Sequence, residues 1–74
     1  MDILKVLARI NQDGDFEHSD DFLEDGLLDS FEVVDLVTEL EEEFSIEISG
    51  ADIIPENFKN VKTITKLLEK YIGG

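Results

Sequence analysis

The sequence contains no cysteine, and it has only six lysine and arginine residues against 19 aspartate and glutamate residues. The absence of cysteine excludes disulfide bonds, a cysteine nucleophile and a cysteine-ligated zinc site. Any thiol chemistry would therefore need a sulfur atom that the sequence does not encode. The shortage of positive charge leaves a formal net charge of −13, which disfavours DNA, RNA and anionic membranes as partners. We expect partner proteins with basic surfaces instead.

The groups that a hydrolase would need are also missing. His18 is the only histidine, and no lysine or arginine lies between Arg9 and Lys59. A serine nucleophile needs a base to activate it and donors to stabilise the oxyanion, so we expect no catalytic residues. No apolar run resembles a signal peptide or a membrane span. These absences predict a cytoplasmic, monomeric protein without enzymatic activity.

The apolar residues recur at helical spacing, which predicts an all-α fold in a single domain over residues 1–74. Asp2 is placed to cap a first short helix, and the polar run NQDGD would end it. The core-facing residues of this helix would be Ile3, Val6, Leu7 and Ile10. An acidic loop of about a dozen residues should follow.

The longest predicted helix runs from about Asp29 to Phe44. Its core face would carry Val33, Leu36, Val37, Leu40 and Phe44. A final helix should run from Val61 or Thr63 to Ile72, with Ile64, Leu67, Leu68 and Tyr71 facing the core. The segment SGADIIPENF between these helices holds at most a short turn or two, which Pro55 is suited to open. The expected fold is a small bundle of three main helices plus one short helix.

Ser30 stands at the start of the longest helix, in the run LLDSFEVVDL. If Asp29 is the N-cap, Glu32 occupies the third helical position and can complete a capping box. The Ser30 hydroxyl would then be free and would point outward. The alternative is that Ser30 is itself the cap, because serine is favoured there.

The runs EDGLLDSFEVVDLVTELEEEFSIEI and ENFKNVKTI resemble the acyl and peptidyl carrier protein family over essentially the whole chain. The shared pattern is D-S-F at the head of the second helix, followed by an acidic amphipathic helix that ends E-E-x-F. The resemblance implies an acyl-carrier-protein-like bundle, with 4′-phosphopantetheine from coenzyme A attached to Ser30. The thiol of this arm, which carries cargo as a thioester, would supply the sulfur that the sequence lacks.

The resemblance also implies partners for this chain. They are a phosphopantetheinyl transferase, an acyl- or aminoacyl-loading enzyme, and downstream acceptor enzymes with basic docking surfaces. Asp29 would help to hold the Mg²⁺ that the transferase uses. The run GLLDSF is closer to D-alanyl and stand-alone aminoacyl or peptidyl carriers than to the GADSL of fatty acid synthase carriers, so the cargo class stays open.

Helical geometry predicts a docking patch beside Ser30. Phe31, Val34 and Thr38 fall between the core face and the acidic face of the second helix. Apolar side chains rimmed by carboxylates would combine electrostatic steering with apolar contact. The expected recognition residues are Asp29, Phe31, Val34, Asp35, Thr38, Glu41 and Glu42. The alternative is that Phe31 packs against the preceding loop.

Two other functions compete with the carrier hypothesis. The stretch Asp13 to Glu24 places oxygen-bearing side chains at the ligand positions of an EF-hand calcium loop. However, His18 stands where that loop needs glycine, and Gly26 interrupts the helix that should leave it. We therefore expect no metal site. The second alternative is an acidic protein-interaction adaptor, which differs from a carrier because it needs no covalent change at Ser30.

Overall fold

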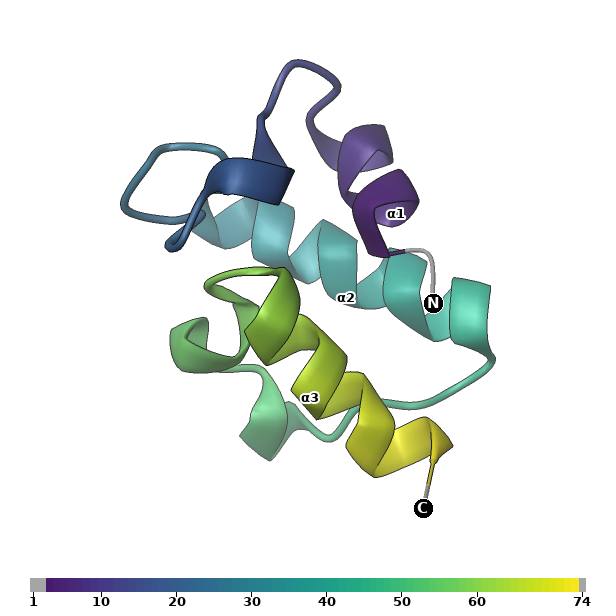
Figure 1. Cartoon of the computed structure of the whole chain (residues 1–74). Coiled ribbons are helices and arrows are strands. Elements are labelled where there is room, and N and C mark those ends of the chain that lie inside the picture. Colours follow the sequence, from purple (N-terminus) through teal and green to yellow (C-terminus); the bar gives the residue numbers. More distant parts are fainter. Residues whose placement is uncertain (1–2, 74) are drawn as a thin grey trace.

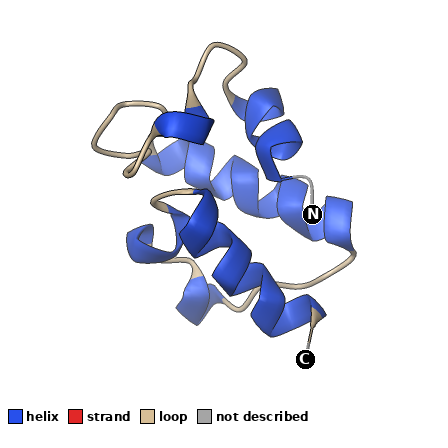
Figure 2. Cartoon of the chain, in the orientation of Figure 1, coloured by secondary structure: helices blue, strands red, loops and turns tan. Residues whose placement is uncertain are grey.

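The computed structural model describes residues 3–73. Three α-helices form the bundle: α1 (Ile3–Ile10), α2 (Ser30–Phe44) and α3 (Val61–Ile72). Three short 3₁₀ helices stand between them, namely η1 (Phe16–His18), η2 (Gly50–Asp52) and η3 (Pro55–Phe58). Figure 1 shows α2 running across the molecule, and Figure 2 shows that the described part consists of helices and loops without strands.

The prediction of a small all-α bundle is confirmed, with one correction. The single short helix that we expected is replaced by the three 3₁₀ helices. Pro55 opens η3, as predicted, because proline has its φ angle preset for a first helical turn. Each helix between Ile3 and Gly73 is too short or too polar to cross a bilayer.

The core lies where the apolar faces of the helices meet. α1 packs against both α2 and α3, and it buries Ile3, Val6 and Leu7. The predicted cap at Asp2 lies outside the described residues. The predicted core face of α2 is confirmed for four residues, Val33, Leu36, Val37 and Leu40, whereas Phe44 at the end of the helix is only partly buried.

The connection between α1 and α2 is better anchored than predicted. It spans residues 11–29, which agrees with the polar run NQDGD followed by an acidic loop of about a dozen residues. Its side chains Phe16, Phe22 and Leu28 are buried, and the first two rings meet edge to face at 4.9 Å between centroids. Isolated apolar residues in an acidic loop have no periodicity, so the sequence did not indicate this anchoring.

Hydrogen bonds tie the same connection to distant parts of the chain. The backbone N–H of Phe22 donates to the carbonyl of Lys59, and the side-chain amide of Asn60 donates to the carbonyl of Asp20 at 2.9 Å. Asn60 also caps α3 through a capping box with Thr63. The start of α3 therefore fixes the acidic connection, which lies at the same end of the molecule as the start of α2 (Figure 1).

Tyr71 joins α3 to η2. We predicted that this residue would be buried with Ile64, Leu67 and Leu68, but it is only partly buried while the other three are buried. The reason is that its hydroxyl makes two hydrogen bonds. It donates to the Asp52 carboxylate and accepts from the backbone N–H of Ser49 at 3.0 Å. A phenol that bridges two polar groups at the edge of the core needs access to both.

Replacement of Tyr71 by phenylalanine is expected to raise the pKa of Asp52. The hydrogen bond from Tyr71, followed by the hydrogen bond from Lys70, holds the pKa of this carboxyl below its ordinary value of 3.8. In the wild type, the stability that depends on ionised Asp52 is fully present above pH 3.8, and it is lost as the pH falls through the lowered pKa.

NMR titration of the Asp52 carboxyl carbon in both proteins would measure this change. Acid unfolding monitored by circular dichroism should show a smaller Asp52-dependent loss of stability in Tyr71→Phe. An unchanged pKa would mean that Lys70 alone sets the titration. Tyr71→Phe keeps the ring, so the comparison isolates the hydroxyl.

Charge is distributed very unevenly along the chain. Seventeen acidic residues and no lysine or arginine lie between Ile10 and Phe58. Arg9 neutralises part of this charge, because its guanidinium contacts Glu43 at 2.9 Å and Glu39 at 3.2 Å. These contacts raise the pKa of Arg9, and they join α1 to the second half of α2.

Millimolar Mg²⁺ or Ca²⁺, or mild acidification, is expected to raise the melting temperature, because cations and protons reduce the repulsion among these carboxylates. Each kcal/mol of repulsion relieved should add about 4–8 °C in a domain of this size. Thermal unfolding at matched ionic strength in NaCl separates general screening from divalent binding. A melting temperature that no ion changes would show that the repulsion is small.

Candidate functional site

Ser30 is exposed and is the first residue of α2. Asp29 stands before it in extended conformation and acts as the N-cap. The alternative in which Ser30 caps the helix is therefore wrong. Since capping does not require the Ser30 hydroxyl, this group can take a substituent without loss of the helix start.

The predicted capping box around Ser30 is present. The Oδ1 atom of Asp29 accepts from the backbone N–H of Glu32 at 2.8 Å, and the Oε1 atom of Glu32 accepts from the backbone N–H of Asp29 at 3.1 Å. Each carboxylate uses one oxygen in this pair, so the other oxygen stays available to a cation or a partner. The two bonds hold the backbone on both sides of Ser30.

The predicted apolar patch next to Ser30 is exposed. The side chain of Phe31 is 82% exposed and that of Val34 is 59% exposed. The alternative in which Phe31 packs against the preceding loop is therefore wrong. Large apolar side chains that lie in water beside one another favour an interaction surface.

The polar residues predicted around this patch differ in their exposure and in their hydrogen bonds. Asp35, Thr38 and Glu42 are exposed, and the Thr38 hydroxyl donates to the carbonyl of Val34 at 3.3 Å. Glu41 is partly buried, and its carboxylate accepts from the backbone N–H of Ile48 at 2.8 Å. This bond gives Glu41 a structural task in holding the chain that leaves α2, in addition to any role in recognition.

The structure brings a second segment to Ser30 that the sequence did not indicate. An apolar recess of about 230 Å³ is lined by Leu23, Ser30, Val33, Val34, Ile53, Ile54 and Pro55. Ile54 is 42% exposed. The signal that could have revealed it is the apolar pair Ile53-Ile54 directly before Pro55, which had no helical partners to explain it.

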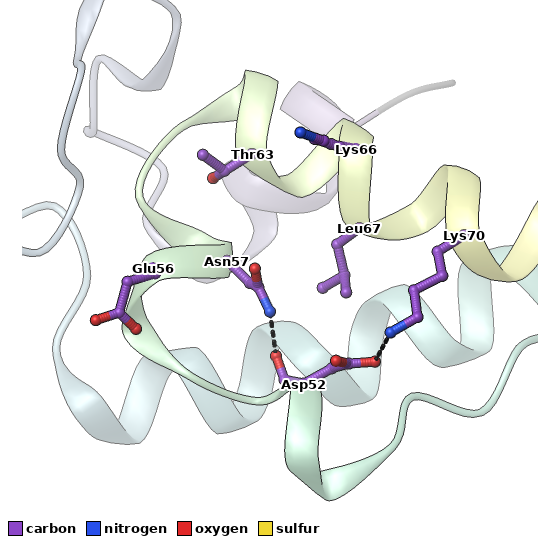
Figure 3. A pocket seen from close by; sticks show the side chains of 7 residues that line it. All are labelled: Asp52, Glu56, Asn57, Thr63, Lys66, Leu67 and Lys70. Atoms are coloured by element: carbon purple, nitrogen blue, oxygen red, sulfur yellow. Dashed lines mark hydrogen bonds and ion pairs between the residues drawn. The ribbon is translucent and has the colours of Figure 1, made fainter.

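A larger hollow of about 470 Å³ lies between η2, η3 and α3 and contains none of the predicted site residues. Figure 3 shows Lys66 and Lys70 projecting from α3 above Asp52 and Asn57. The ammonium group of Lys70 contacts Asp52 at 2.9 Å, and the amide of Asn57 donates to the Asp52 carbonyl at 2.8 Å. Asp52, Asn57 and Lys70 are thus bonded to one another across this hollow.

The EF-hand alternative is not favoured by the structure. Residues 3–73 contain no group of three or more His, Asp or Glu side chains arranged to hold a metal ion. The His18 ring instead contacts Asp15 at 3.0 Å, and that carboxylate raises the pKa of the imidazole. Residues 19–29 form turns and bends and lack the helix that must follow a calcium loop.

Comparison with known proteins identifies the family. A family model described as the phosphopantetheine attachment site matches residues 1–68. Searches of curated proteins and of solved structures gave no significant match. The matched range covers all of α1 and α2 and most of α3. The chain therefore belongs to the family of phosphopantetheine attachment domains, which are carrier proteins that bear covalently attached 4′-phosphopantetheine.

Proposed function

We propose that Ser30 is the attachment residue and that the arm shuttles acyl or aminoacyl groups, held as thioesters, between enzymes. The observation that carries this proposal is that Ser30 is exposed at the first position of α2, where Asp29 caps the helix and the Ser30 hydroxyl is not needed for capping. The arm supplies a thiol to a chain without cysteine. The protein itself presents the hydroxyl, holds the arm and provides a surface for its partners, without a catalytic step of its own.

The start of α2 suits a phosphate ester electrostatically. Free backbone N–H groups and the positive end of the helix dipole favour an anion there by about 0.3–1 kcal/mol at an exposed position. Asp29 opposes a phosphate by like-charge repulsion. Its second carboxylate oxygen can offset this effect during transfer by binding a cation such as the Mg²⁺ of the transferase, while its first oxygen remains bonded to Glu32.

The partners that fit this surface are enzymes with basic docking faces: the transferase, a loading enzyme and acceptor enzymes. Asp35 and Glu42 would steer them at long range through solvent, and Phe31 and Val34 would make the contact that fixes their position. Asp29, Thr38 and Glu41 complete the proposed recognition set. Neither steering nor contact identifies the cargo, which depends on the loading enzyme.

Mass spectrometry of the intact wild-type protein tests the proposal. After incubation with coenzyme A, Mg²⁺ and a broad-specificity transferase, the protein should gain the mass of one phosphopantetheinyl group. An acidic adaptor would keep its original mass under the same conditions. A wild-type mass that stays unchanged with a transferase that modifies a known carrier in parallel would refute the proposal.

A further inference from the structure

Lysine is absent from the long part of the chain that surrounds Ser30. After Lys5, the next lysine in the sequence is Lys59. The connection before α2, the whole of α2 and the segment after it therefore carry no lysine amine. A lysine amine converts a thioester into a stable amide, because nitrogen is a strong nucleophile when it is neutral. The position of Lys59 thus decides whether a thioester near Ser30 meets such an amine.

Lys59 is joined to the Ser30 end of the molecule by two backbone hydrogen bonds. The carbonyl of Phe22 accepts from the backbone N–H of Leu28 at 3.1 Å. The backbone N–H of Phe22 donates in turn to the carbonyl of Lys59 at 2.6 Å. Leu28 stands two residues before Ser30. These bonds and standard backbone dimensions place the Cα atom of Lys59 at most about 21 Å from that of Ser30.

The backbone of Lys59 is fixed, whereas its side chain lies in solvent. Lys59 directly follows η3 and precedes Asn60, which caps α3, and the neighbouring Phe58 is fully buried. The Lys59 side chain is exposed. Its ammonium forms no ion pair with a carboxylate of residues 3–73. The amine can therefore turn across the surface around a fixed Cα atom.

The arm and the lysine side chain are together long enough to meet. About fourteen bonds separate the serine oxygen from the sulfur of phosphopantetheine, which equals between four and five residues of extended backbone, or roughly 16 Å. The five bonds of a lysine side chain add about 6 Å. The combined reach of about 22 Å exceeds the largest possible separation of the two Cα atoms, and the Ser30 side chain extends it further.

We propose that Lys59 is a modification site, whose amine takes the acyl group from the thioester on the arm of the same chain. This inference rests on the proposed carrier function. The neutral Lys59 amine attacks the carbonyl carbon, and a C–N bond forms while the C–S bond breaks. The sulfur departs as a thiolate and receives the proton that the nitrogen loses. The products are an acyl-lysine amide and a free thiol, so the step needs no further reagent.

The shared chain makes this transfer faster than acylation by a thioester in solution. A flexible tether raises the effective concentration of its end to about the millimolar range. An ordinary lysine is nevertheless mostly protonated at neutral pH, so transfer should be slow compared with delivery to an enzyme. Lys59 would therefore remove a cargo that stays on the arm too long, and it would limit the lifetime of the loaded protein.

Transfer of an acetyl group tests the inference. A broad-specificity transferase supplied with acetyl-coenzyme A attaches an arm that already carries the thioester. The protein is freed of acetyl-coenzyme A and incubated at about pH 8.5, where more of an ordinary lysine is neutral. Hydroxylamine then cleaves the remaining thioesters and leaves amides intact. Tandem mass spectrometry should locate a stable acetyl group on Lys59, with a yield that dilution does not change.

Arginine variants identify the acceptor. Lys59→Arg keeps the positive charge but has no nucleophilic amine, so we expect it to lower the amide yield by about tenfold. Lys62→Arg is the matched control, because Lys62 is also exposed and lies only three residues further along. It lines a separate hollow with Glu17 and Asp20, so its replacement should leave the yield within about twofold. Equal acetylation of Lys59 and Lys62 would overturn the inference.

A protein without the attachment hydroxyl shows where the acetyl group comes from. Ser30→Ala should gain no acetyl group on Lys59 in the same incubation, and circular dichroism checks that each variant keeps its helical content. Acetylation of Ser30→Ala to the wild-type extent would overturn the inference. A wild type that gains the arm and keeps its acetyl group as a thioester would overturn the inference alone. A wild type that gains no arm would overturn the proposed function as well.

Discussion

Replacement of Ser30 by alanine is expected to abolish attachment of the phosphopantetheine arm while the helical content of the protein stays unchanged. The loss should be complete, because in the proposed function the oxygen atom of the Ser30 hydroxyl forms the bond to the arm. The fold should persist for two structural reasons. Ser30 is exposed, and Asp29 and Glu32 form the capping box without its side chain.

Ser49→Ala is the control for this experiment. Ser49 is also exposed, but it stands directly before η2 as its N-cap, where its hydroxyl accepts from the backbone N–H of Ala51. Intact-mass spectra should show one added group on Ser49→Ala and none on Ser30→Ala. A Ser30→Ala protein that still gains the mass would move the attachment site to another residue, and tandem mass spectrometry would locate it.

Replacement of Val34 by aspartate is expected to weaken docking at every salt concentration. The new carboxylate would lie in the apolar patch, where binding must strip its water without providing a partner. We expect this cost to increase the dissociation rate, with a loss in affinity of about tenfold or more. The variant should fold, because the Val34 side chain is 59% exposed.

Charge reversal at Asp35 or Glu42 should behave differently. Both carboxylates are exposed, so they act mainly on the association rate, and the effect should shrink as salt screens them. Surface-binding kinetics with the transferase at low and high salt would separate the two classes. If Val34→Asp binds normally, the patch is not the interface, and if the charge reversals slow association equally at high salt, steering is not their role.

The fold could be predicted where periodicity or local chemistry is strong. Val33, Leu36, Val37 and Leu40 recur at helical spacing, and this regularity alone defined the buried face of α2. The D-S-F-E run predicted the capping box, because each group in it bonds to a group three residues away. The same two patterns placed Ser30, Phe31 and Val34 in solvent.

Features that depend on distant contacts could not be predicted. Phe16 and Phe22 look like scattered residues in an acidic loop, and only the packed structure shows that each is buried. Ile54 reaches Ser30 because the 45–60 segment folds back to the start of α2. Glu41 looked like a rim carboxylate, but its bond to Ile48 appears only when the chain after α2 is placed. Such contacts form only when distant segments of the chain meet, and helical spacing in the sequence does not indicate which segments will meet.

The two hydrogen bonds of the Asp29 and Glu32 capping box have a consequence for how the chain folds. Both join residues only three apart in sequence, so they form without closing a long loop, whereas the recess beside Ser30 needs the start of α2 to meet residues 53–55, which lie at least 19 residues further along the chain. During folding, the turn that presents Ser30 can therefore form as soon as α2 begins to wind. The recess can form only after the chain has closed around the core, so a newly made chain would expose the Ser30 hydroxyl before the apolar surface beside it is complete.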